Sequence, residues 1–256
     1  MDELLDIASV AEYLGVSERT VYNRVRSGDL PAVKVGRLWR VRVADLEAWL
    51  GAPDASAGTA SDAQCVAEAG VVPSREELER AVGRFEDRIE RRLAFVGVLA
   101  QAYEALGWPA PVVVGGHAVE FWSAGGYATA DIDMAGASEP AAQILGGWGF
   151  SRQGRHWYDD ALGIVVEIPG SSLSAAALAH TATVRLGEYV ATVLGIEDLI
   201  VDRLCACEHW SDAESCLWAE ALLKSGHQLD ERYLRERATE EQVLERLERL
   251  QQGSAS

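Results

Sequence analysis

The chain has 256 residues, of which 48% are hydrophobic and 25% are charged, and its formal net charge at pH 7 is −17. This length provides for one small and one medium domain, and the acidic balance excludes a protein that binds nucleic acid through its whole surface. No hydrophobic stretch is long enough to cross a bilayer, and the start Met1-Asp2-Glu3 lacks the basic flank of a signal peptide, so we expect a cytoplasmic protein without a membrane partner.

The first predicted motif is a pair of short helices within residues 9–25. Gly15 permits a tight turn between them, and Ser17 caps the second helix. Val21 and Val25 mark the face that this second helix buries. Its outward residues are candidates for contact with a DNA major groove, namely Arg19, Thr20, Asn23 and Arg24.

A β-hairpin, or wing, should follow in residues 30–43, where apolar residues alternate with polar ones around Gly36-Arg37. Its candidate DNA contacts are Lys34, Arg37 and Arg40, and a closing helix from Val43 to Leu50 completes the unit. Residues 3–50 resemble the winged helix-turn-helix domains of the excisionase and MerR-type family. This resemblance implies duplex DNA as a partner, usually bound by a homodimer.

The basic residues of the chain are concentrated in this predicted DNA-binding unit. Residues 17–42 hold seven basic residues and two acidic ones, although the whole chain is acidic. A basic helix and wing would release counterions from DNA on that face alone. The alternative is a helix-turn-helix fold that serves contacts with other proteins.

Residues 51–74 are rich in Ala, Gly and Ser without an apolar period, which predicts a flexible linker. The pattern from Arg75 to Leu106 predicts a helix that covers the sheet of a second domain, at residues 75–252. Strands and helices alternate in the middle of this domain, and helices close it from Ile196 onward. The charged tail from Asp230 to Gln251 has a narrow apolar stripe that packs either on its own domain or on a second subunit.

Three short motifs of the second domain suggest phosphate chemistry. An apolar run ends in Gly115-Gly116, where phosphate oxygens can approach main-chain N–H groups at the start of a short helix. Asp131-Ile132-Asp133 follows in an apolar segment, so both carboxylates share one face of a strand. Glu167 lies in the apolar strand from Gly163 to Pro169, where a carboxylate must be solvated, paired or coordinated.

In this order the motifs resemble the nucleotidyltransferase superfamily, and within it the minimal nucleotidyltransferases of toxin and antitoxin systems, over residues 95–225. The resemblance implies that Asp131, Asp133 and Glu167 are catalytic and bind Mg²⁺ or Mn²⁺, with an NTP as substrate. It also implies nucleotide contacts at Gly115, Gly116, His117, Thr129 and Arg203. Such enzymes often carry a basic residue shortly before the first aspartate, and residues 127–130 contain none.

Two of these assignments have alternatives in the sequence. His117 can cap its helix instead of touching substrate, and Arg203 can form an ion pair with a neighbouring acid. His156 has no recognisable partner in the sequence. The four cysteines show no disulfide framework, and we expect buried thiols at Cys65, Cys205, Cys207 and Cys216.

The sequence therefore predicts an α+β chain, with a winged helix-turn-helix domain at residues 1–50 and a nucleotidyltransferase-like mixed sheet flanked by helices, followed by a C-terminal helical segment. The first functional hypothesis is a DNA-binding protein that transfers NMP from an NTP to an RNA, a protein or a small molecule, in a toxin-antitoxin or self-regulating system. The alternative is a transcription regulator whose transferase fold senses a nucleotide or binds a partner protein. The few basic residues near the predicted site favour this alternative.

Overall fold

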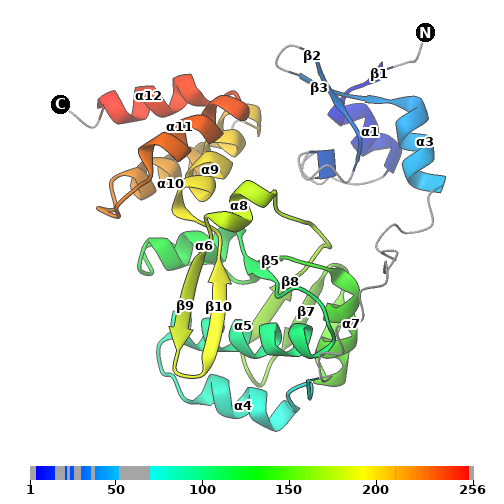
Figure 1. Cartoon of the computed structure of the whole chain (residues 1–256), viewed down its shortest axis with the longest axis vertical. Helices are drawn as coiled ribbons and strands as arrows, with labels where there is room; N and C mark the ends of the chain where they lie inside the picture. The colour runs from blue at the N-terminus through cyan, green and yellow to red at the C-terminus, as the bar shows by residue number, and fades with distance from the viewer. Residues whose placement is uncertain are drawn as a thin grey trace. The chain divides into compact units, whose positions relative to one another are not determined.

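The structure, a computed structural model, describes residues 4–14, 21, 24–25, 30–35, 38–51, 70–210 and 212–253 (Figure 1). The chain divides into two compact units, the first from its N-terminal part and the second mainly from residues 68–170 and 175–256. None of the described helices is long and apolar enough to span a bilayer.

The first unit is a small three-stranded sheet with helices packed on it. Its described elements are β1 (Leu4–Leu5), α1 (Ile7–Leu14), β2 (Val33–Val35), β3 (Leu38–Arg42) and α3 (Val43–Gly51). The strand order is β1-β3-β2, and both pairings are antiparallel. Its apolar core contains Val10, Ala11, Val21, Val25, Leu30, Val41 and Leu46.

The predicted hairpin, the closing helix and the burial of Val21 and Val25 are confirmed. Strand β1 was missed, because two residues are too few to show an alternating pattern. Several predictions lie outside the described residues: the turn at Gly15 and Ser17, the candidate contacts Arg19, Thr20, Asn23 and Arg37, Cys65, and residues 52–69 of the linker. The domain boundaries at residues 50 and 74 therefore stay predictions.

A seven-stranded mixed sheet forms the centre of the second unit (Figure 1). Its strands are β4 (Val112–Val113), β5 (Ile132–Ala135), β6 (Ser151–Gln153), β7 (His156–Asp159), β8 (Ile164–Glu167), β9 (Ala182–Leu186) and β10 (Tyr189–Val193). The strand order is β6-β7-β8-β5-β4-β10-β9. The pairs β5–β8 and β10–β4 are parallel and the other pairs are antiparallel, so the predicted mixed sheet is confirmed.

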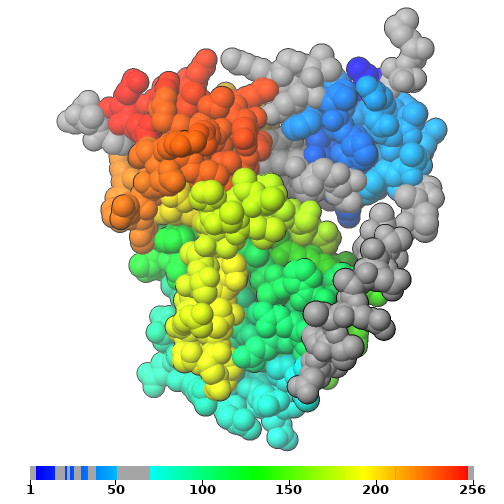
Figure 2. Space-filling view, in the orientation of Figure 1, coloured from blue at the N-terminus to red at the C-terminus, as the bar shows by residue number. Residues whose placement is uncertain are grey.

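Helices cover this sheet. The helices before the C-terminal segment are α4 (Arg75–Gly83), α5 (Arg88–Ala105), α6 (Gly115–Trp122), α7 (Ser138–Gly147) and α8 (Ala175–Ala179). The long helix α5 packs against β9, β10, α4 and α7, and most of its side chains are buried. In Figure 2 the yellow band of β9 and β10 runs from the C-terminal helices toward α4 on the visible face of the second unit.

The predicted single helix from Arg75 to Leu106 is wrong, because this segment forms two helices, α4 and α5. Helix α4 ends at Gly83, and the side chain of Asp87 then caps α5 by accepting hydrogen bonds from the N–H groups of Ile89 and Glu90. A glycine at a helix end followed by an aspartate cap is a stop-and-start signal that outweighs the continuous apolar pattern.

The C-terminal helices are α9 (Ile196–Trp210), α10 (Ala213–Leu223), α11 (Glu231–Glu240) and α12 (Leu244–Gly253). Helices α11 and α12 both contact α9, and the stripe residues Leu234 and Leu247 are fully buried there. Arg237 Nε donates to Asp198 at 2.9 Å, and the hydroxyl of Tyr233 donates to the same carboxylate at 2.6 Å. The apolar stripe therefore packs on its own unit.

Gly97 allows α5 to approach β10 closely, since a Cβ there would lie 2.7 Å from the Cβ of Tyr189 and 3.0 Å from the main-chain nitrogen of Val190. We expect Gly97→Ala to lower the free energy of unfolding by about 1–3 kcal/mol, the usual cost of overpacking, in urea denaturation. Gly83→Ala is the matched control, because no described atom lies within 4 Å of its added Cβ. It should leave stability unchanged or raise it. Equal losses of stability in both variants would contradict this close packing.

Candidate metal and nucleotide site

Three adjacent strands place one acid or histidine each in a single cross-strand row. Asp133 of β5 pairs with Glu167 of β8, and Glu167 pairs with His156 of β7. Because directly paired residues point to the same face of a sheet, the three side chains share one face. Asp131 precedes β5 by one residue and lies two positions before Asp133, so it belongs to that face as well.

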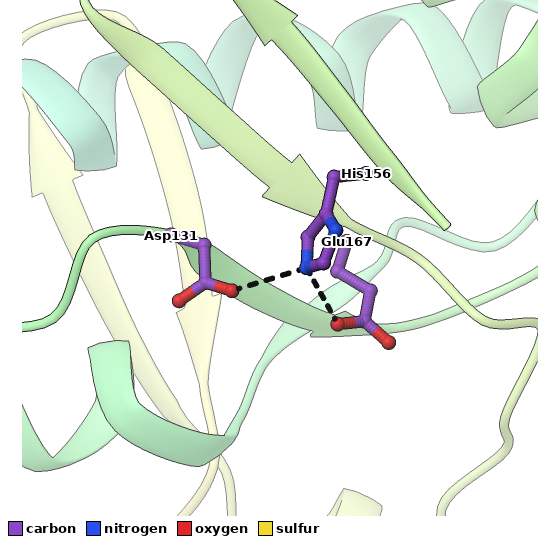
Figure 3. Close-up of side chains that lie close together, drawn as sticks. All are labelled: Asp131, His156 and Glu167. Atoms are coloured by element: carbon purple, nitrogen blue, oxygen red, sulfur yellow. Dashed lines mark ion pairs between the residues drawn. The ribbon is translucent and has the colours of Figure 1, made fainter. Parts of the chain in front are cut away.

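Asp131, His156 and Glu167 converge at this row (Figure 3). His156 Nε2 lies 3.6 Å from Asp131 Oδ2 and 3.4 Å from Glu167 Oε2. One ligand atom from each residue lies within 4.8 Å of the other two. Ligand atoms around one ion, at bond lengths of about 2.1 Å, are separated by roughly 3–4 Å, so these residues fit a divalent cation.

Asp133 is held by the glycine turn at the start of α6. The main-chain N–H of Gly116 donates to Asp133 Oδ2 at 3.0 Å. Gly115 has a φ of +57°, and a Cβ there would lie 2.4 Å from the same oxygen, so only glycine fits. The Gly116 N–H that the sequence assigns to phosphate binding thus donates to a protein carboxylate, and Asp133 is not among the three converging residues.

Thr129 and Arg92 position Asp131. The Thr129 hydroxyl donates to Asp131 Oδ1 at 2.9 Å. Its nucleotide contact stays a prediction. The guanidinium of Arg92, which is 6% exposed on α5, donates to the main-chain oxygens of Thr129 and Ala130 at 3.0 and 2.9 Å. The segment before Asp131 lacks a basic residue of its own, and α5 supplies one from a distant part of the sequence.

Glu167 is buried and paired. It is 8% exposed, and Arg155 Nε lies 3.1 Å from its Oε2. Burial raises the pKa of Glu167 above its ordinary value, and the positive charge of Arg155 offsets only part of this rise. The position of Glu167 in an apolar strand is therefore explained by pairing, and its oxygen also lies within reach of a shared cation.

Arg203 of α9 is buried and forms an ion pair with its neighbour Asp202, at 2.5 Å. Burial alone would lower the pKa of Arg203, but Asp202 and the more distant Asp133 outweigh burial, and the pKa is raised. The sequence offers a surface ion pair with a neighbouring acid as the alternative. The pair with Asp202 is present but buried, and the phosphate contact of Arg203 stays a prediction. Because the negative charge of Asp133 contributes to this rise in pKa, the guanidinium of Arg203 interacts electrostatically with the acidic row.

His117 lies in a buried network and does not reach solvent. Its Nδ1 is 3.1 Å from Oε2 of Glu120, which also pairs with Arg92 at 3.0 Å and with Arg88. Its Nε2 has no hydrogen-bond partner among the described residues. Burial lowers the pKa of His117, so the ring is neutral near pH 7. The alternative of helix capping is wrong, because the His117 ring contacts Glu120, and the N-terminal N–H of α6 at Gly116 donates to Asp133 instead.

The predicted absence of disulfides is wrong. Cys207 of α9 and Cys216 of α10 form a disulfide, with their Cα atoms 5.0 Å apart. Helices α9 and α10 pack against each other directly, which brings together two thiols on separate helices. Cys205 is buried and lies outside this disulfide, as predicted.

Sequence reasoning missed His156 and Arg92 as neighbours of the acids. The partner of His156 depends on the register of β7 against β8, which the turns around these strands determine. Two other arginines of the second unit, Arg152 and Arg185, lie on opposite edge strands of the sheet, β6 and β9. They therefore do not converge with Arg203.

Three of the predicted DNA contacts belong to the described residues. The guanidinium of Arg24 lies over the Trp49 ring, 5.3 Å from its centroid, and Arg40 Nη1 donates to the main-chain oxygen of Trp39 at 2.9 Å. Both side chains are half-buried. Lys34 lies in β2, next to the hairpin turn.

Residues 4–52 match the helix-turn-helix domain family. The N-terminal unit is a helix-turn-helix domain. Two Mycobacterium tuberculosis proteins, from strains CDC 1551 / Oshkosh and ATCC 25618 / H37Rv and each named "Putative DNA-binding protein", are 54% identical to this chain over 39 residues. The match covers 15% of this chain and 50% of each relative, so the chain spans about half the length of the curated relatives it matches.

The raised pKa of Glu167 generates a prediction about pH. Because folded Glu167 holds its proton more tightly than the unfolded chain does, the protonated form stabilises the fold at low pH, and this contribution is lost as pH rises through the folded-state pKa. Gln is neutral at every pH. Glu167→Gln should therefore match the wild-type Tm near pH 4 and exceed it by a few degrees near pH 7, in calorimetric scans. A lower Tm at pH 7 would show that the pair with Arg155 stabilises more than burial costs.

Proposed function

We propose that the second unit is a metal-dependent nucleotidyltransferase that transfers NMP from an NTP to an acceptor, and that the first unit binds duplex DNA. The observation that carries the first part is the cross-strand row. Asp131, Asp133 and Glu167 share one sheet face, directly after a glycine turn that packs on Asp133. This arrangement supports the resemblance to nucleotidyltransferases that the spacing of the motifs suggests.

Each residue has a specific role in this proposal. Asp131 and Glu167 hold Mg²⁺ or Mn²⁺, and such an ion supplies charge neutralisation at the phosphates and the leaving pyrophosphate. Arg203 contributes positive charge toward the triphosphate, while Thr129 keeps the Asp131 carboxylate oriented. One carboxylate of the row accepts the proton of the attacking hydroxyl. Asp133 fixes the turn from Gly115 to Gly116 against the row.

The acceptor class follows from the resemblance and from the fused helix-turn-helix domain. An RNA 3′ end, a side chain of a partner toxin or antitoxin, and a small molecule all carry a hydroxyl that fits the reaction. The DNA-binding unit favours a self-regulating system of the toxin-antitoxin kind, in which the protein controls its own promoter from the cytoplasm.

A second candidate is a transcription regulator whose transferase fold does not catalyse. Two contacts favour this candidate. Arg155 forms an ion pair with Glu167, and the Gly116 N–H already donates a hydrogen bond to Asp133. In this case the fold would sense a nucleotide or bind a partner protein.

A transfer assay separates the two candidates. The full chain, incubated with radiolabelled NTP, Mg²⁺ or Mn²⁺ and cell lysate, should label an acceptor whose size identifies its class. Asp131→Asn should reduce labelling by at least about 100-fold, as expected when a metal ligand is removed. The matched control is Asp160→Asn, an exposed acid directly after β7, which should keep full activity. Equal labelling by Asp131→Asn would contradict the proposed site, and no labelling by wild type with any NTP would favour the regulator.

DNA binding by the first unit rests on the family match and on its basic residues. The names of the two relatives agree with it. Arg24 and Arg40 are two of its described arginines, and each contacts a tryptophan, through the Trp49 ring or the Trp39 carbonyl. Pre-ordered guanidinium groups of this kind suit contacts with phosphates or base edges.

The full chain should bind promoter duplex DNA more tightly at low salt than at high salt, as measured by fluorescence anisotropy. The double variant Arg24→Ala/Arg40→Ala should flatten the slope of log binding constant against log salt by about 0.9 for each phosphate that it no longer neutralises. A control with the same charge change is Arg232→Ala/Arg235→Ala on α11, which should keep the slope. If both double variants weaken binding equally, bulk charge and not the first unit would explain the binding.

A further inference from the structure

We propose that His156 is a metal ligand, and that Asp131, His156 and Glu167 form a site for a divalent transition-metal ion such as Mn²⁺ in preference to Mg²⁺. The inference rests on the proposed function for the role of the ion. Binding of the ion itself does not require transfer activity. The ligand set differs from the three carboxylates that the sequence indicates, because His156 takes the place of Asp133.

The position of His156 is set by backbone pairing. Strand β7 pairs with β8 in the register His156↔Glu167, so the imidazole stands beside the carboxylate on the same face. Its Nε2 lies between the two acids, at 3.6 Å from Asp131 Oδ2 and 3.4 Å from Glu167 Oε2 (Figure 3). These separations match neighbouring ligand atoms around one small cation, which are roughly 3–4 Å apart.

The chemistry of the ligand set determines which cation it prefers. Two carboxylates and one imidazole offer oxygen ligands together with a nitrogen donor. Mg²⁺ strongly prefers oxygen ligands and retains several waters. Mn²⁺ also favours carboxylates, but as a first-row transition metal it accepts an imidazole nitrogen more readily than Mg²⁺ does. A nitrogen ligand at this position therefore gives Mn²⁺ an advantage that a site of carboxylates alone would not provide.

Arg155 is the cationic group that an ion would displace. Its Nε shares Glu167 Oε2 with His156, but its side chain is 66% exposed, whereas that of His156 is 35% exposed. A long exposed side chain can turn into solvent at small cost. Glu167 is itself buried, so its carboxylate requires a cationic partner, and a metal ion would replace the charge that Arg155 leaves.

Metal binding is tested on the full chain without NTP. Titration followed by the electron paramagnetic resonance signal of free Mn²⁺, with Mg²⁺ as competitor, should give at least about tenfold tighter binding of Mn²⁺. Pulsed spectra of the bound Mn²⁺ should show coupling to one ¹⁴N nucleus. His156→Gln should abolish this coupling and weaken Mn²⁺ binding by about tenfold or more, while Mg²⁺ binding changes little.

Two further variants serve as controls. His227→Gln changes an exposed histidine that bonds to the Trp122 carbonyl, and it should keep both the coupling and the affinity. Arg155→Gln should tighten Mn²⁺ binding, because it removes the competing cation, and this result does not depend on the folding of His156→Gln. Bound Mn²⁺ without nitrogen coupling, equal affinities for Mn²⁺ and Mg²⁺, or no binding would each overturn the inference.

The outcomes also separate this inference from the proposed function. Nitrogen-coupled Mn²⁺ in a protein that transfers no NMP would overturn the transferase alone. Transfer supported by Mg²⁺ in a protein without nitrogen coupling would overturn the role of His156 alone.

Discussion

The parallel pairing of β5 with β8 is the constraint on which the site depends. Ile132 and Val166 pair directly, and both are fully buried, while their neighbours Asp133 and Glu167 pair on the opposite face. A slip of one residue would place Glu167 in the core and Val166 on the site face. The hydrophobic core thus enforces the register, and the register brings the carboxylates together despite their repulsion.

A buried polar network of Glu120, His117 and Arg92 connects α6 and α5 to the segment before Asp131. Glu120 is fully buried on α6. Burial raises its pKa, but His117 and Arg92 outweigh burial, so the pKa is lowered and the carboxylate is charged. Arg92 also holds the main chain before Asp131. Helix α5 therefore connects the glycine helix to the aspartate segment, and the cost of burying these charges is offset by their mutual pairing.

The sequence was sufficient for features that local patterns encode. The hairpin β2–β3 and the shared face of Asp131 and Asp133 follow from alternation and from turn residues, whereas the mixed sheet is implied by the resemblance to nucleotidyltransferases. Features that depend on long-range register or packing were missed. His156 meets Glu167 only through the pairing of β7 with β8, and Arg92 reaches Thr129 from α5. The disulfide of Cys207 with Cys216 likewise requires two helices to pack side by side, which no spacing along one helix reveals.

The open sheet of the second unit has an arginine on each outer strand. Arg152 lies on β6 and Arg185 on β9, both with exposed side chains, and Arg152 also stacks near Trp157. Edge strands expose main-chain N–H and C=O groups that can pair with a strand of another molecule. The charged side chain of an arginine at the edge would be costly to bury in such a pairing. Both arginines thus oppose aggregation through the sheet edges, and this protection is independent of the face that carries Asp131, His156 and Glu167.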